Sequence, residues 1–250
     1  NKALIPWVEA LVGFSEKHYE KTGHPLFSSH MLDLSAEDID LNLSECERML
    51  KRMAPIGMSL EIELGVTGGE EDGVGSDDDI GADNPKLYTQ PEDCLRAYQL
   101  LSPIGHFSLA ASFGNVHGVY KPGNVKLRPE ILKNSQDLVR QTCGTDEKPL
   151  DLVFHGGSGS DKSKISEALS YGVFKMNIDT DTQFAVSKAV GAYVEENPKA
   201  FKYQIDPDDG TPYKKKYDPR TWMRAGEQSM VERLDEAFQD LGSIGKSLAS

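Results

Sequence analysis

Two histidines each follow a short apolar segment and come directly before glycine. His155 ends the run LDLVF and precedes two glycines, and His117 precedes Gly118 in the stretch LAASFGNVHG. A neutral imidazole is a good zinc ligand, and a catalytic zinc usually has three protein ligands and one open position. One such histidine alone is more often a hydrogen-bonded residue of the core. Two in matching positions favour a metal site.

Acidic residues accompany the ends of other apolar segments. Glu61 and Glu63 alternate with apolar residues in SLEIEL, and Asp33 follows the segment HML. Alternate side chains of a strand point to the same face, so the two glutamates share one face of their strand. We expect these three carboxylates to lie near the two histidines.

Two neighbouring loops have the composition of anion-binding loops. Gly156, Gly157 and Ser158 lead into an expected helix, and NIDTDTQ, residues 177–183, does the same after the next strand. Glycine lets the backbone approach a ligand closely, and N–H groups at a helix start attract anions. One loop alone would as readily be a tight turn. Adjacent loops of this kind predict a phosphate site.

Two further stretches carry reactive side chains. The segment TGGEEDGV places Glu70 and Glu71 in a glycine-flanked loop, where a carboxylate can act as a general base; the alternative is an acidic surface turn. Lys175 could form a Schiff base. Nothing else supports that role, and a structural or salt-bridged lysine is the better interpretation.

The elements that carry these residues alternate along the chain. We expect five strands separated by helices, which indicates βα units and a parallel sheet. Either an open doubly wound sheet or part of a (β/α)8 barrel is compatible with this order. The polar face of residues 59–64 favours the barrel, because a strand buried on both faces reads as continuously apolar. The expected strands lie within residues 24–32, 58–65, 106–114, 150–155 and 173–178, and the expected helices include 6–22, 129–142, 161–171, 180–196 and 219–241.

Two further helices begin at expected capping boxes. One pairs Ser35 with Asp38, and the other pairs Thr89 with Glu92. Each box would fix the start of a helix on the sheet.

Composition limits the class of protein. The 27 basic and 40 acidic residues give a net charge of −13, which argues against general affinity for nucleic acid or anionic membranes. The 3 cysteines have no metal-binding spacing and fit a reducing, cytoplasmic compartment. The sequence has no apolar run of membrane-spanning length.

The longest motifs together resemble class II fructose-bisphosphate aldolases, in the long-loop, homodimeric branch of these metal-dependent (β/α)8 barrels. The resemblance runs from residue 4 almost to the C-terminus, and the motifs keep their order. It rests on LFSSHMLDLS, LEIELGVTGGEEDGV, LYTQPED, AASFGNVHGVYKPGNVKLRPEIL, VFHGGSGS, FKMNIDTDTQ and YDPRTWMRAG.

The resemblance implies a role for each matching residue. His117 and His155 would bind zinc, with Glu63 and Asp33 at an alternative metal position or beside it. Glu71, next to Glu70, would move the proton of the three-carbon substrate. Dihydroxyacetone phosphate would be held by Gly118, Gly156, Gly157, Ser158, Asn177, Ile178, Asp179 and Thr180, Lys121 would lie near a cation and the phosphate, and Arg220 would bind the second phosphate.

The implied reaction is reversible cleavage of fructose 1,6-bisphosphate to dihydroxyacetone phosphate and glyceraldehyde 3-phosphate. Zinc would stabilise the enediolate as a Lewis acid, with a second divalent metal position and a monovalent cation as further possibilities. A tagatose-bisphosphate aldolase is the nearest alternative. A non-catalytic aldolase remnant with a binding or structural role is the alternative from another class.

The chain departs from the family pattern at its N-terminus. The family has a further zinc histidine and a catalytic aspartate in a motif before the region that matches residues 1–10. We therefore expect residues 1–250 to form a single aldolase barrel domain that holds the last five βα units and the C-terminal helices. The intact protein would be about 100 residues longer, the size of three more βα units.

Overall fold

The computed structural model describes residues 3–69, 87–118 and 126–247. The chain divides into two compact units, Asn1–Asn177 and Ile178–Ser250. The first unit combines β-strands with helices, and the second unit is mainly helical. The expectation of a single domain over residues 1–250 stays a prediction.

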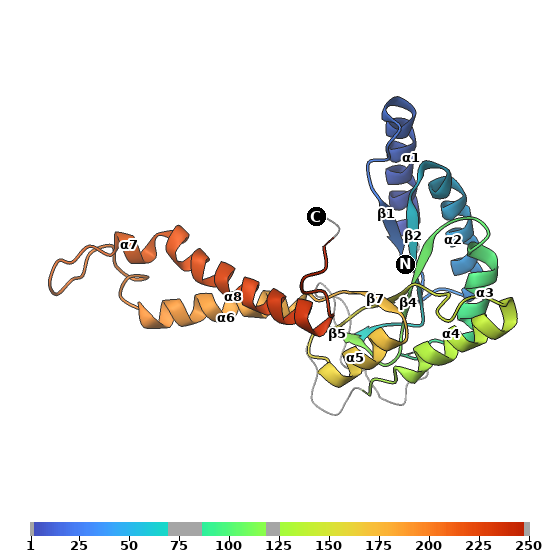
Figure 1. Cartoon of the computed structure of the whole chain (residues 1–250). Coiled ribbons are helices and arrows are strands. Elements are labelled where there is room, and N and C mark those ends of the chain that lie inside the picture. Colours follow the sequence, from blue (N-terminus) through green and yellow to red (C-terminus); the bar gives the residue numbers. More distant parts are fainter. Residues whose placement is uncertain (1–2, 70–86, 119–125, 248–250) are drawn as a thin grey trace. The chain divides into compact units, whose positions relative to one another are not determined.

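The first unit is built on a parallel sheet of five strands in the order β1-β2-β4-β6-β7 (Figure 1). All five strands lie within the segments predicted from sequence, and their order along the sheet follows their order along the chain. The strands are β1 Ser29–Leu32, β2 Ser59–Leu64, β4 Phe107–Ala111, β6 Leu152–Phe154 and β7 Val173–Met176.

The register of the sheet brings acidic and small residues to one end. Leu32 of β1 pairs with Ile62 of β2, and Glu63 pairs with Ala110 of β4. Asp33 is therefore the next residue after the paired part of β1, beside the end of β2. The carboxyl ends of these parallel strands meet at the same edge of the sheet.

Helices cover the sheet and close its core. In Figure 1, α2, α3 and α4 lie next to one another over the sheet, and each turns a row of buried apolar residues inward. Burial of these apolar side chains is the main contribution to the stability of the folded state. The helices of this unit are α1 Leu4–Thr22, α2 Ile39–Met53, α3 Pro91–Leu101, α4 Glu130–Cys143 and α5 Lys162–Ser170, with a 3₁₀ turn η1 at Ala54–Ile56.

The first predicted capping box is wrong. Helix α2 begins at Ile39, and Asp38 is its N-cap, accepting a hydrogen bond from the N–H of Asp40 at 2.9 Å. Ser35 instead donates its hydroxyl hydrogen bond to Asp33 at 2.6 Å. Asp33 and Ser35 form a local turn, so the Ser35 hydroxyl is not available to cap the helix.

The second predicted capping box is also wrong. Helix α3 begins at Pro91 after Gln90, without a side-chain cap. The hydroxyl of Thr89 donates to the carbonyl of Leu64 and accepts from the N–H of Ser112, so it joins the ends of β2 and β4. Tertiary hydrogen bonds outcompete the local cap at this position.

A second, two-stranded sheet was not predicted. It pairs β3, Gly68–Gly69, with β5, Val116–His117, in parallel. Its strands are too short to give a periodic sequence signal. The pairing places His117 on a strand that follows β4 after a short connection.

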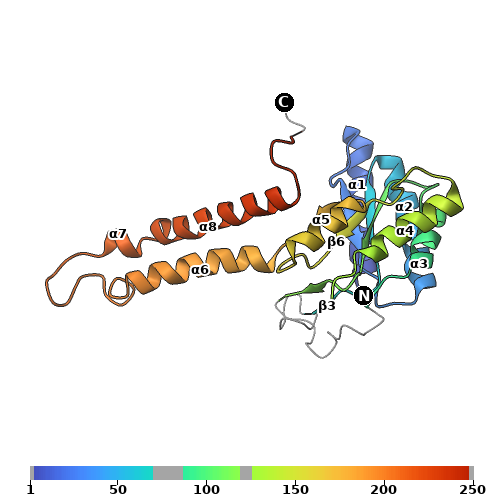
Figure 2. The same cartoon turned by 60° about the horizontal axis from the view of Figure 1, so that its bottom comes forward.

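The second unit is a pair of helices with a connecting segment. Helices α6, Thr180–Glu196, and α8, Pro219–Asp240, run side by side in both views, with the short α7, Lys214–Tyr217, between them in sequence (Figures 1 and 2). Gly226 allows this close packing, because a Cβ there would lie 3.0 Å from Cγ1 of Val186. Both long helices match the sequence prediction.

None of the helices in the described ranges is long and apolar enough to cross a membrane.

Candidate active site

The imidazole of His155 lies between two buried glutamates of β2. Its Nδ1 is 3.0 Å from Oε2 of Glu63, and its Nε2 is 3.0 Å from Oε1 of Glu61. All three residues are at least nine-tenths buried. The alternation of β2, which puts both glutamates on one face, therefore builds the two sides of the histidine site.

Each glutamate is held at its other oxygen. Lys175 of β7 donates to Oε2 of Glu61 at 2.7 Å, and the hydroxyl of Thr67 donates to Oε1 of Glu63 at 2.8 Å. The interpretation of Lys175 as a salt-bridged lysine is confirmed. The result is a row of polar groups across β2, β6 and β7 that is buried at His155 and the two glutamates and partly exposed at Lys175.

Charges in this cluster shift one another's pKa values. Burial lowers the pKa of His155, but the hydrogen bonds that its ring donates to Glu61 and Glu63 outweigh burial and raise the pKa to about 9. Burial raises the pKa of Glu61, yet His155 and Lys175 together lower it. Without a metal, the cluster therefore favours an imidazolium between two carboxylates at neutral pH. A histidine must lose its added proton to bind a metal, so metal binding to His155 would release a proton.

His117 lies close enough to His155 to share a metal ion with it. The two ring centroids are 6.2 Å apart, with 34° between the ring planes. Each imidazole nitrogen binds zinc at about 2.0–2.1 Å, and a ligating histidine usually has a carboxylate on its other nitrogen. The pair and the flanking glutamates fit part of a zinc site. Within the described residues, no group of three His, Cys, Asp or Glu side chains is arranged to hold a metal.

Asp33 follows the end of β1 and is engaged in a local turn. Its Oδ1 accepts hydrogen bonds from both the N–H and the hydroxyl of Ser35, at 3.1 and 2.6 Å. Its role in a second metal position stays a prediction.

The loop after β6 is shaped by close backbone contacts. Gly156 has a φ of 60°, and a Cβ there would lie 2.3 Å from the carbonyl oxygen of Val116. Only glycine fits this approach of the loop to β5. The N–H of Gly157 donates to the carbonyl of Asn177 at 3.0 Å, so this N–H is already used within the protein. Ser158 is buried beside it.

Asn115 connects the two histidine segments, and sequence reasoning did not identify it. Its side-chain amide donates to the carbonyl of His155 at 2.8 Å, and its Oδ1 accepts from the N–H of Phe113 at 2.8 Å. Asparagine in the sequence GNVHG, next to Gly114 with its φ of 92°, was a usable sign of a fixed turn.

Some predicted residues lie elsewhere or outside the described ranges. Gly118 follows β5 with a φ of 79°. Glu70, Glu71 and Lys121 lie outside the described residues.

The remaining predicted residues belong to the second unit. Helix α6 begins at Thr180, directly after Ile178 and its N-cap residue Asp179, whose carbonyl accepts a hydrogen bond from the N–H of Thr182 at 2.9 Å. Arg220 is exposed and binds Asp218 through Nε at 3.0 Å and Nη2 at 2.7 Å. This guanidinium holds the pKa of Asp218 well below its usual range.

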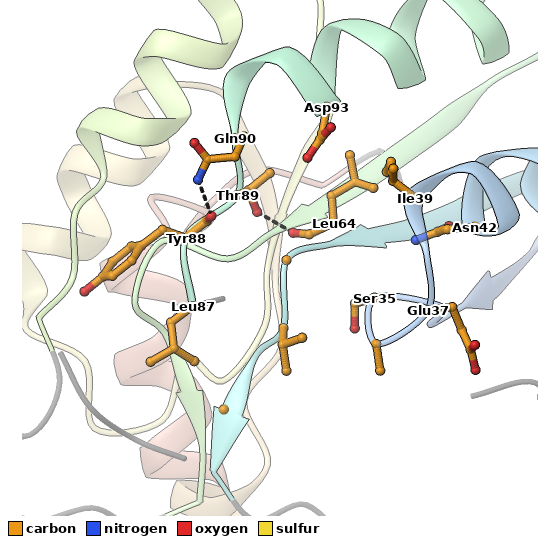
Figure 3. Close-up of a pocket in the computed structure, with 14 residues that line it drawn as sticks. Ser35, Glu37, Ile39, Asn42, Leu64, Leu87, Tyr88, Thr89, Gln90 and Asp93 are labelled. Carbon is orange, nitrogen blue, oxygen red and sulfur yellow. Dashed lines mark hydrogen bonds between the residues drawn. The ribbon is translucent and has the colours of Figure 1, made fainter. Parts of the chain in front are cut away.

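A cavity of about 820 Å³ opens beside the end of β2 and the first turns of α2 and α3 (Figure 3). None of the predicted site residues lines it. Its wall holds the backbone of β2 in place: Asn42 donates to the Glu63 carbonyl at 3.0 Å, and Thr89 donates to the Leu64 carbonyl. These bonds fix the strand that carries Glu61 and Glu63.

The family model, the similar proteins and the solved structure below indicate the same family. Residues 13–246 match the family described as fructose-bisphosphate aldolase class-II. A fructose-bisphosphate aldolase of Campylobacter jejuni is 54% identical over 250 residues, which cover 98% of this chain and 70% of that protein. Fructose-bisphosphate aldolase class 2 of Escherichia coli K12 is 53% identical over 246 residues, which cover 97% of this chain and 68% of that protein. A crystal structure of the Campylobacter jejuni aldolase matches with a TM-score of 0.83 and 52% identity, covering 98% of this chain and 69% of that one.

Proposed function

The chain belongs to the class II fructose-bisphosphate aldolases, and we propose that the cluster around His155 is the centre of its active site. Its reaction is the reversible cleavage of fructose 1,6-bisphosphate into dihydroxyacetone phosphate and glyceraldehyde 3-phosphate. The observation that carries the assignment of the site is the buried imidazole between two glutamates, 6.2 Å from the ring of His117.

We assign zinc to this cluster, with His117 and His155 as two of its ligands. Bound there, the metal supplies Lewis-acid polarisation of the substrate carbonyl. Glu63 and Asp33 are assigned to a second divalent position or to residues that surround the first. The role of a monovalent cation, with Lys121 near it, belongs to the same proposal.

The protein groups around the carbonyl have separate tasks. Glu71, beside Glu70, takes and returns the proton of the three-carbon substrate. Gly118, Gly156, Gly157 and Ser158 enclose dihydroxyacetone phosphate and exclude water from it. Since the Gly157 N–H is bonded to Asn177, its contribution is to let the loop pack against Met176, whose Cε would lie 2.4 Å from a Cβ at this position. The binding set is completed by Asn177, Ile178, Asp179 and Thr180.

The second phosphate is assigned to Arg220. A guanidinium binds phosphate through two parallel hydrogen bonds, and Asp218 already holds this one in a fixed orientation. A local cation of this kind offsets the net charge of −13, which would otherwise repel an anionic substrate.

The architecture proposed for the whole fold is a (β/α)8 barrel of the long-loop branch. The order β1-β2-β4-β6-β7 supports it, because a doubly wound sheet reverses its strand order at the switch point. A homodimer is supported by apolar side chains exposed on α6 and α8, among them Phe184, Met223 and Phe238. Three free cysteines support a cytoplasmic location.

Metal removal tests the site. A chelator should abolish aldolase activity, and Zn²⁺ should restore it. His155→Ala should then bind zinc far more weakly while its circular dichroism spectrum is unchanged. Full activity without metal, or a borohydride-trapped adduct on Lys175, would refute the assignment.

Two further measurements refine the function. Glu71→Gln should slow proton exchange of dihydroxyacetone phosphate by about 10²-fold or more, the usual contribution of a positioned base. Comparing kcat/KM for fructose and tagatose bisphosphates separates the two sugar specificities, because the metal and phosphate groups are common to both.

A further inference from the structure

We propose that Glu61 and Lys175 are positioning residues for metal binding: Lys175 holds Glu61, and Glu61 fixes the His155 ring from its Nε2 side so that Nδ1 faces the metal. The inference rests on the assignment of His155 as a metal ligand made above. Neither residue touches substrate in this role. Both act through the orientation of one imidazole.

The first support is that Glu61 is fixed at both oxygens. Oε1 is 3.0 Å from Nε2 of His155, and Oε2 is 2.7 Å from Nζ of Lys175. A buried carboxylate is costly unless a cation and hydrogen bonds compensate it. Lys175 provides that cation from β7, on the far side of β6 from β2 in the sheet. One residue therefore ties three strands around the imidazole.

The second support is the difference between the two glutamates. The oxygen of Glu63 that does not face His155 is bound by the neutral hydroxyl of Thr67, whereas the corresponding oxygen of Glu61 is bound by an ammonium group. Glu61 is therefore the more strongly anchored partner. Glu63 is the one that can turn away, or bind the metal itself, when the ion enters. This leaves Nε2 hydrogen-bonded to Glu61 and frees Nδ1.

The third support is the exposure of Lys175. Its side chain is 45% exposed, while that of Glu61 is 10% exposed. The ammonium group keeps part of its hydration, so the pair does not bear the full desolvation penalty of a buried ion pair. The arrangement places a stable negative charge behind Nε2, and such a carboxylate strengthens a histidine ligand.

The experiment measures zinc affinity by competition with a chromophoric chelator, which does not depend on turnover. Glu61→Gln and Lys175→Met should each raise the zinc dissociation constant by about 10- to 100-fold, the usual effect of losing such a partner. Lys175→Arg should restore most of the affinity because it keeps the cation. Lys133→Met is the matched control, since Lys133 forms an exposed ion pair with Asp137 on α4 and should leave affinity unchanged.

A second measurement identifies which nitrogen of the His155 ring carries the proton. Long-range ¹H–¹⁵N spectra of the zinc-loaded protein should show a proton on Nε2 of His155. Zinc dissociation constants within twofold of wild type in both Glu61→Gln and Lys175→Met, or a proton on Nδ1, would overturn the proposal. If His155→Ala itself keeps wild-type zinc affinity, the metal assignment fails first, so the two failures are distinguishable.

Discussion

The side-chain amide of Asn115 donates a hydrogen bond to the backbone carbonyl of His155 at 2.8 Å. Because Asn115 also binds the N–H of Phe113, it fixes the turn before β5 to the end of β6. We expect Asn115→Ala to lower the free energy of unfolding by about 1–3 kcal/mol, since it leaves buried backbone groups without partners. Urea unfolding followed by circular dichroism measures this.

The control for that substitution is Asn134→Ala. Asn134 is exposed on α4, so its replacement should change the free energy of unfolding by about 0.5 kcal/mol or less. Equal effects of the two substitutions would show that the Asn115 bonds contribute nothing specific.

Thr89 offers a second test of how the end of β2 is held. Thr89→Val keeps the size of the side chain but removes the hydroxyl that joins the Leu64 carbonyl to the Ser112 N–H. We expect a loss of about 1–3 kcal/mol in the free energy of unfolding, because both backbone groups are buried. Amide exchange of Ser112 should accelerate in parallel.

Thr22→Val is the corresponding control. Its hydroxyl binds the His18 carbonyl at an exposed helix end, where water can replace it. If Thr89→Val is no more destabilising than Thr22→Val, the β2–β4 bridge is not a structural determinant.

The sequence predicted most strands and helices, and it predicted that Glu61 and Glu63 share one face of their strand. Alternation in residues 59–64 placed Glu61 and Glu63 on one face, and this face does contact His155. Periodicity works here because alternate side chains of a strand share a face whatever the strand's partners are. The ranges of the other strands and of the helices were predicted from the same kind of periodicity, with a period of about 2.0 residues in strands and about 3.6 in helices.

The partners across the sheet were beyond sequence reasoning. Lys175 meets Glu61 although β4 and β6 lie between their strands in the sheet. The hydroxyl of Thr89 bonds to Leu64 and Ser112 and not to the expected helix start. Both capping predictions used local rules, and tertiary contacts decided the outcome. Asn115 was missed because its role depends on a contact with His155, which is 40 residues away in the chain.

The cysteines give a test of the core that does not involve activity. Burial raises the pKa of Cys46 and of Cys94 to about 12, whereas Cys143 is exposed. The thiolate is the reactive form, so at pH 8 the two buried thiols should not react with a chromogenic disulfide reagent. We expect one equivalent to react quickly in the native protein and three in denaturant. Rapid reaction of Cys46 or Cys94 in the folded state would contradict this account of α2 and α3.

Arg220 provides the sharpest test of the second phosphate. Arg220→Ala should raise KM for fructose 1,6-bisphosphate by about 10-fold or more, the size of a lost charge-assisted hydrogen bond. The affinity for dihydroxyacetone phosphate should barely change, because that ligand lacks the second phosphate. Steady-state kinetics and direct binding of the three-carbon ligand separate these effects.

Arg224→Ala is the matched control on the same helix. Arg224 lies one turn further along α8, is exposed, and pairs with Glu227 at 2.6 Å. Its removal changes the net charge of the protein as much as removal of Arg220 does, so any general electrostatic effect on an anionic substrate appears in both variants. A rise in KM confined to Arg220→Ala therefore reports a direct contact. Equal losses in both variants, or an equal loss of affinity for both ligands in Arg220→Ala, would show that Arg220 does not bind the second phosphate.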